Sequence, residues 1–167
     1  MSYDLYLLRK DEVGDDPSAA YERLEEQEER EPTPDEVRQL RQLAGELQAA
    51  NPGVDLVESD KGFFLQLGYE GERPVVIDIG PEEMTMSWSY GADDAEAALA
   101  EVRLYLPVFE RHGYVAFDPQ LERLFDVDRD AEQAGEIHRD VHRNMQETYG
   151  SQPSKSRPWW KRFFGYG

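Results

Sequence analysis

The chain has 167 residues, a length typical of a single domain, with 36 Asp and Glu against 18 Lys and Arg. Its formal charge of −18 repels phosphate backbones and anionic lipid headgroups, which disfavours nucleic acid and membrane surfaces as partners. Because it lacks cysteine, a signal-peptide pattern and an apolar run of the roughly 20 residues that cross a bilayer, we expect a cytoplasmic protein without disulfides or thiol catalysis.

The first third of the chain predicts one strand and two helices. Residues 3–9 are mostly aromatic and aliphatic, which is typical of a strand. Asp16 followed by Pro17 predicts the start of a short helix, because Asp caps a helix and Pro is favoured at its first position. Residues 33–36, Thr-Pro-Asp-Glu, form a capping box, and the helix that they begin is expected to end at residues 51–53, Asn-Pro-Gly.

The middle of the chain predicts four strands joined by short turns, at residues 54–59, 62–69, 74–79 and 84–90. Turns of this length favour an antiparallel meander. In the last strand apolar side chains alternate with Thr and Ser, so we expect one face of the sheet to meet solvent.

A third helix is predicted from Asp93 to just before Gly113, with a kink at Pro107. A strand at residues 114–118 follows, and a short turn closes the core near residue 126. The order β-α-α-β-β-β-β-α-β predicts an α+β fold, a mostly antiparallel sheet with helices packed on one face. A ferredoxin-like arrangement is the alternative.

The predicted organisation is a core domain at residues 1–126, an amphipathic C-terminal helix at residues 127–150, and a flexible basic, aromatic tail at residues 151–167. The tail holds four Lys and Arg and no acid, which leaves 14 cations against 36 acids, a charge of −22, on the rest of the chain. Exposed aromatic rings are costly in water. We therefore expect a docking element in the tail, formed by Trp159, Trp160, Lys161, Arg162, Phe163 and Phe164. Its docking surface is another protein or the acidic body of the same chain, with a membrane ranked last.

Two patterns resemble metal sites, but each lacks residues that such a site requires. Residues 126–130 begin like a calcium loop, but Ala131 and Ile137 stand where that loop requires Gly and Glu, so we expect a solvated acidic helix start. His138 and His142 lie four residues apart, yet two ligands do not make a site. We expect both histidines to be exposed, with neither metal nor cofactor bound.

Three strand carboxylates, Asp4, Asp78 and Asp118, are the candidates for acid–base chemistry if they converge in one pocket. The alternative is that each lies on the solvent face or caps a turn, which suits Asp118 in particular because Pro119 follows it. No phosphate-binding loop, nucleophile elbow or Ser/His/Asp pattern is present in the sequence.

The segments Ser2-Tyr3-Asp4-Leu5-Tyr6 and Gly113-Tyr114-Val115-Ala116-Phe117-Asp118-Pro119-Gln120 resemble a group of small uncharacterised bacterial proteins. Some members are immunity-like, cytoplasmic partners of secreted toxins, so the resemblance implies binding and supplies no active-site residues. Residues 11–36 hold 12 acids and two arginines, a density that speeds encounter with a cationic protein. The leading hypothesis is a non-enzymatic acidic module, an immunity-type inhibitor of a basic partner; the alternative is a small-molecule enzyme that uses the strand carboxylates.

Overall fold

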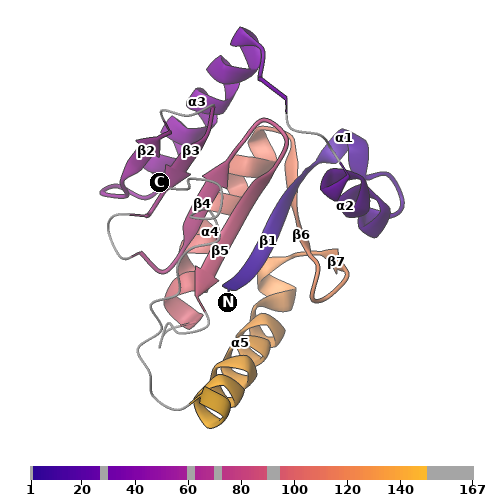
Figure 1. Ribbon diagram of the computed structural model, residues 1–167, viewed down its shortest axis with the longest axis vertical. Helices are drawn as coiled ribbons and strands as arrows, with labels where there is room; N and C mark the ends of the chain where they lie inside the picture. Colours follow the sequence, from indigo (N-terminus) through magenta and orange to yellow (C-terminus); the bar gives the residue numbers. More distant parts are fainter. Residues whose placement is uncertain (1, 27–29, 60–62, 70–72, 90–94, 150–167) are drawn as a thin grey trace, which may run out of the picture.

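The computed structural model describes residues 2–26, 30–59, 63–69, 73–89 and 95–149 and contains one antiparallel sheet of seven strands (Figure 1). The strands are β1 (Ser2–Arg9), β2 (Leu56–Glu58), β3 (Leu65–Leu67), β4 (Val76–Ile79), β5 (Met84–Ser89), β6 (Tyr114–Asp118) and β7 (Arg123–Leu124). Their order across the sheet is β2-β3-β4-β5-β1-β6-β7. The N-terminal strand therefore lies inside the sheet, between two strands that follow it by many residues.

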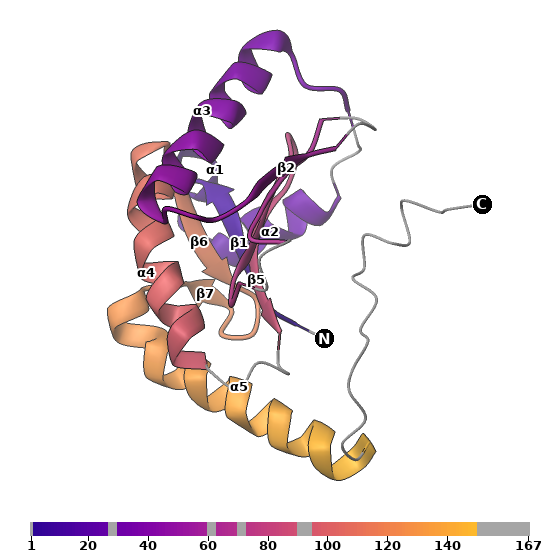
Figure 2. The same ribbon diagram turned by 90° about the vertical axis from the view of Figure 1, so that its left-hand side faces the viewer.

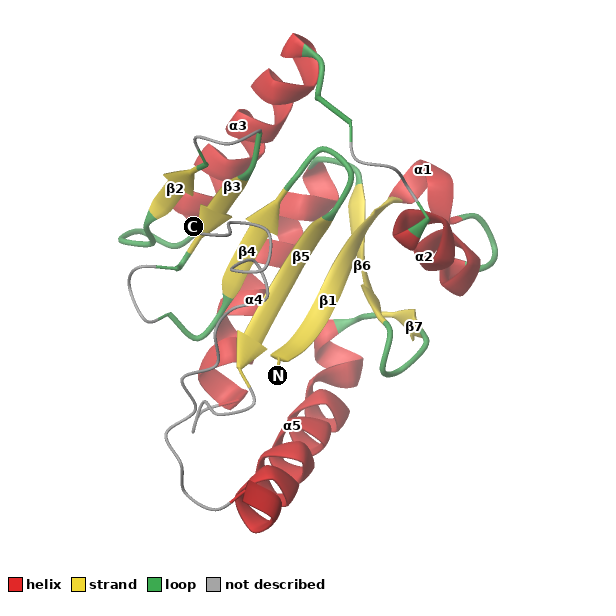
Figure 3. Ribbon diagram, in the orientation of Figure 1, coloured by secondary structure: helices red, strands yellow, loops and turns green. Residues whose placement is uncertain are grey.

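Helices lie on both faces of this sheet, as Figures 2 and 3 show. The helices are α1 (Lys10–Val13), α2 (Pro17–Glu25), α3 (Pro34–Ala50), α4 (Ala95–Arg111) and α5 (Val127–Tyr149). Helices α3 and α4 cover one face, and α5 packs along α4. The shorter α1 and α2 lie against the opposite face, beside β1, β6 and β7.

Alternation along β1 builds a core on each face of the sheet. Tyr3, Leu5 and Leu7 enter the large core under α3 and α4, where Leu5 is fully buried. Leu8 points the other way and packs with Phe117 in the small core under α2. Because successive side chains of a strand point to opposite faces, this one strand supplies both cores.

The α+β fold and the predicted order of elements are confirmed. The one-turn helix α1 and the two-residue strand β7 are additions to that order. The expectation of helices on one face holds for α3 and α4, whereas α2 packs on the other face through Ala20 and Tyr21. Seven strands in this order differ from the ferredoxin-like alternative.

The predicted helix signals act as expected where the structure describes them. Asp16 Oδ1 accepts a hydrogen bond from Ala19 N–H at the start of α2. The Thr33 hydroxyl accepts from Glu36 N–H, and Glu36 Oε2 accepts from Thr33 N–H at 2.7 Å. Helix α4 continues through Pro107 to Arg111, while its expected start at Asp93 lies outside the described residues.

The predicted solvent face of the sheet is wrong where Thr85 and Asp78 lie. These side chains point away from α3 and α4, yet both residues are only 5% exposed. Thr85 stands between Asp78 and Tyr6 in one cross-strand row, so larger side chains flank it on both sides. Period-two alternation identifies the two faces of a strand but not how much of each face its neighbours cover.

Replacing Thr33 by Ala removes the acceptor for Glu36 N–H and should lower the free energy of unfolding by about 1 kcal/mol. Chemical denaturation followed by far-UV circular dichroism measures this loss. Thr33→Ser keeps the hydroxyl and serves as the control. An equal loss in both variants would contradict the capping role.

Candidate functional site

A row of polar side chains crosses the sheet on the face away from α3 and α4. The strand registers place Gln66 opposite Asp78, Asp78 opposite Thr85, and Thr85 opposite Tyr6. Gln66 Nε2 donates to Asp78 Oδ1 at 2.6 Å. Asp4 lies on the same face, opposite Ser87. The structure therefore brings two of the three predicted strand carboxylates to one face.

The carboxyl group of Asp78 holds its proton more tightly than an ordinary aspartate. Burial raises its pKa to about 6, the hydrogen bond from Gln66 opposes this rise, and the negative charge of Asp4 adds to it. A carboxyl that titrates near neutral pH is a feature of acid–base sites and also of buried structural acids. Asp78 is the one described acid in this row that combines burial with a raised pKa.

Asp118, the third predicted carboxylate, does not join the other two. It is fully buried on the face that α4 covers, where the Tyr3 hydroxyl donates to its Oδ2. Its Oδ1 accepts from Gln120 N–H at 2.8 Å and from Leu121 N–H at 3.1 Å. The expected turn-capping role of Asp118 is thus present, and the sheet separates it from Asp4 and Asp78.

The acidic segment at residues 126–130 begins α5. Asp126 Oδ1 accepts from the N–H groups of Asp128 and Arg129, both at 3.0 Å. Asp130, however, is fully buried, which corrects the expectation of a wholly solvated helix start. The guanidinium group of Arg129 holds the pKa of Asp130 well below its usual range, and Arg123 donates to the same carboxylate.

His138 is 3% exposed, so its predicted exposure is wrong. Helix α5 packs along α4, where a Cβ at Gly135 would lie 4.0 Å from Leu99 Cδ1, and this packing covers the neighbouring turn of α5. The side chain of His142 lies outside the described residues. Across the described part of the chain, no three His, Asp or Glu side chains are arranged to hold a metal ion.

A buried polar cluster beside α3 and α4 was not predicted from the sequence. Asn51 Nδ2 donates to the Tyr105 hydroxyl at 2.7 Å, and Arg73 lies 3.5 Å from Glu101 Oε1. Glu101 is 9% exposed, and its Oε2 has no hydrogen-bond partner in the described structure. The helical periodicity of α4 placed Tyr105 and Glu101 next to apolar positions, but only the fold brings Asn51 and Arg73 to them.

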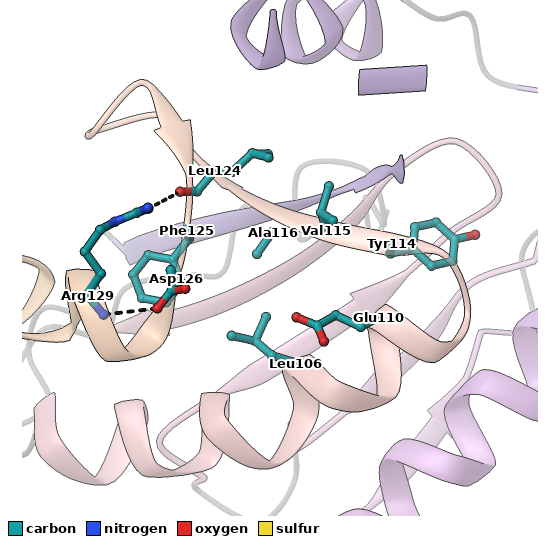
Figure 4. A pocket seen from close by; sticks show the side chains of 9 residues that line it. All are labelled: Leu106, Glu110, Tyr114, Val115, Ala116, Leu124, Phe125, Asp126 and Arg129. Carbon is teal, nitrogen blue, oxygen red and sulfur yellow. Dashed lines mark hydrogen bonds between the residues drawn. The ribbon is translucent and has the colours of Figure 1, made fainter. Parts of the chain in front are cut away.

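A cavity of about 210 Å³ lies beside β6, between α4 and the start of α5 (Figure 4). Its apolar wall is formed by Leu106, Ala116 and Phe125, and charged side chains stand at its rim, Glu110, Asp126 and Arg129. Asp126 and Arg129 reach the rim because β7 and α5 are joined by a two-residue connection. This cavity was not predicted from the sequence, because distant segments of the chain line it.

The charge at this cavity is negative once its hydrogen bonds are considered. Arg129 donates to Asp130 Oδ2 at 2.6 Å and to Leu124 C=O at 2.8 Å, and Asp130 also pairs with Arg123, so these three side chains together carry one positive charge against the two negative charges of Glu110 and Asp126. Glu110 is exposed and has no ion pair with a described residue. Burial raises the pKa of Tyr114, and the ring of this tyrosine lies under the guanidinium of Arg9. The cavity therefore favours a cationic ligand group.

Comparison with protein-family models, with curated proteins and with solved structures finds no match to this chain. No helix in the described ranges is both long enough and apolar enough to span a bilayer. The predicted docking element at residues 159–164 lies outside the described residues. Inferences about function therefore rest on the fold, on the polar row around Asp78 and on the cavity beside β6.

Asp78→Asn should stabilise the protein at neutral pH. The pKa of this aspartate is raised on folding, so the protonated carboxyl favours the native state, and that contribution is lost as pH rises from about 4 to about 6. At pH 7.5 we expect the substitution to raise the free energy of unfolding by up to about 3 kcal/mol, and at pH 4 to change it little.

Urea denaturation at the two pH values measures this difference. Glu132→Gln changes the charge equally at an exposed position of α5 and provides the control. Stabilisation by Asp78→Asn that is the same at both pH values would contradict the raised pKa.

Tyr3→Phe should destabilise the protein by about 1–3 kcal/mol, because it removes a hydrogen bond to a buried carboxylate. Denaturation of Tyr3→Phe, Asp118→Asn and the double variant gives the coupling energy between the two side chains. We expect the loss caused by Tyr3→Phe to be smaller in the Asp118→Asn background. Equal losses in both backgrounds would show that the hydroxyl does not act through Asp118.

Proposed function

We propose that this protein is a non-enzymatic, cytoplasmic binding module whose acidic surface meets a basic protein. The observation that carries the proposal is a group of exposed carboxylates in and beside α2 that lack a cation partner among the described residues. Asp15, Glu22 and Glu26 are exposed, and no Lys or Arg of the described chain lies within ion-pair distance of them. Unpaired surface carboxylates attract a cationic partner without first losing an internal ion pair.

The distribution of charge supports a basic protein as the partner class. Nucleic acid and anionic membranes are repelled by a net charge of −18, whereas a cationic protein is steered toward it. The most concrete form of the proposal is an immunity-type inhibitor of a bacterial toxin. That form rests on the resemblance carried by residues 2–6 and 113–120.

The C-terminal docking element is the second part of the proposal. Trp159, Trp160, Phe163 and Phe164 lie next to Lys161 and Arg162, and each large ring buries roughly 150–250 Å² when it meets a surface. We propose that this segment docks on a protein.

Deleting residues 158–167 should then abolish partner capture and leave the melting temperature nearly unchanged. A large loss of thermal stability with unchanged capture would instead make the segment part of the core.

The enzymatic alternative has one observation in its favour, the raised pKa of Asp78. Asp4 is its nearest predicted carboxylate, two strands away on the same face, and Asp118 lies on the opposite face. The cavity at β6 is lined by none of these three acids. We therefore rank binding above acid–base catalysis.

The acidic-surface proposal is tested by co-purification from the native cell at low salt. Neutralising Asp15, Glu22 and Glu26 to Asn or Gln should weaken capture of the partner by roughly tenfold, because each lost surface charge pair contributes about 0.3–0.5 kcal/mol. The control neutralises Glu96, Glu132 and Glu136, which are exposed on α4 and α5. Recovery of no protein partner, or equal weakening by both triple variants, would count against this surface.

A further inference from the structure

The edge of β6 beside the cavity is covered by β7 over only part of its length. Strand β7 pairs with Phe117 and Asp118, and one more hydrogen bond joins Phe125 N–H to Ala116 C=O at 2.8 Å. The chain then turns away into α5. Tyr114 and Val115 consequently have no strand neighbour on this side within the described structure.

The backbone groups that face this free edge follow from the register with β1. Lys10 N–H donates to Gly113 C=O at 2.8 Å, which makes these two residues a hydrogen-bonded pair. In an antiparallel ladder such pairs alternate, so the backbone of Val115 points toward β1 and that of Tyr114 and Ala116 points away from it. Among the described residues, Tyr114 N–H, Tyr114 C=O and Ala116 N–H have no partner.

The charged side chains beside this edge are carboxylates at the cavity and an ion-pair group at the other end. Glu110 and Asp126 stand at the cavity rim on the α4 side. At the Gly113 end of the edge, Asp11 and Glu12 both pair with Arg9, whose guanidinium lies over the Tyr114 ring, so their negative charge is partly compensated there. A cationic side chain of an extended segment would therefore meet carboxylates at the cavity, Glu110 and Asp126.

We propose that the free edge of β6 is a docking site for an extended, Lys- or Arg-bearing segment of the basic partner. The segment adds as a short strand in line with β7 and hydrogen-bonds to Tyr114 and Ala116. One of its cationic side chains enters the cavity between Glu110 and Asp126. The basic character of the partner rests on the proposed function; the site and the strand geometry rest on β6 alone.

The dimensions of the site suit such a side chain. A cavity of about 210 Å³ has room for several waters or for the stem of a long side chain. The aliphatic stem of Lys or Arg can replace such waters against Leu106 and Phe125 while its charged head stays at the rim. Strand addition supplies affinity through the backbone bonds, and the cavity supplies preference for the side chain.

The experiment titrates the full-length chain at low salt with an N-acetylated, C-amidated octapeptide of alternating Lys and Thr. Calorimetry gives the dissociation constant, and NMR hydrogen exchange gives the protection of single amides. We expect exchange of the Tyr114 and Ala116 amides to slow by roughly tenfold at saturation, because both become hydrogen-bonded. The Val115 amide, already bonded to β1, should change little and is the internal control.

A charge variant and its matched control test the side-chain part of the proposal. Glu110→Lys should weaken peptide binding by about fivefold, because it places a like charge at the cavity rim. Glu96→Lys makes the same charge change on α4 about 21 Å away along the helix and should alter the dissociation constant less than twofold. Equal effects of the two variants would overturn the proposed role of the cavity.

Three further outcomes distinguish a failure of the docking site from a failure of the proposed function. Peptide binding without new protection at Tyr114 and Ala116 would overturn the docking site and leave a general acidic surface. Slow exchange of both amides in the free chain would show that the chain itself, for example through its own basic C-terminal segment, occupies the edge, and would overturn docking of a partner there. An absence of binding at low salt would count against both proposals.

Discussion

The pairing of β1 with β5 on one side and β6 on the other is the constraint on which the rest of the molecule depends. Without β1, the meander β2 to β5 and the hairpin β6 to β7 are two separate pieces. The same strand sends Leu5 to one core and Leu8 to the other. Each face of the sheet therefore owes part of its packing to eight residues at the start of the chain.

The described carboxylates fall into two groups with different physical tasks. Asp118, Asp130 and Glu101 are buried, Asp118 accepts a hydrogen bond from the Tyr3 hydroxyl, and the other two pair with arginines. Asp15, Glu22 and Glu26, in and beside α2, are exposed, and no described Lys or Arg lies within ion-pair distance of them. Buried pairs hold local structure in place, because removing one partner leaves an uncompensated charge. Exposed, uncompensated charge acts at a distance and is therefore the part of the surface that an approaching protein senses first.

Local signals predicted the fold better than they predicted the sites. The capping box at Thr33 and the turn at Asp118 depend on residues a few positions away, and both are present in the structure. The burial of His138 depends on the packing of α5 along α4. The face of the sheet that α2 covers depends on its contacts with Leu8 and Phe117. The free edge of β6 depends on where β7 ends. No periodicity within one segment contains that information, because each outcome is decided by contacts between distant segments.

The position of β1 also determines when it can pair with its neighbours during synthesis of the chain. Its eight residues are made before either of its neighbours, and the second of these, β6, is not complete until Asp118 has been added. At about 5–20 residues per second, that interval lasts on the order of 5–22 seconds. During this time the aromatic and aliphatic residues of β1 have no strand partner on the β6 side, and an unpaired strand is prone to aggregation. Residues 11–36, which lie two residues beyond it, carry 12 acids and two arginines, and repulsion between chains with this charge opposes their aggregation at this stage.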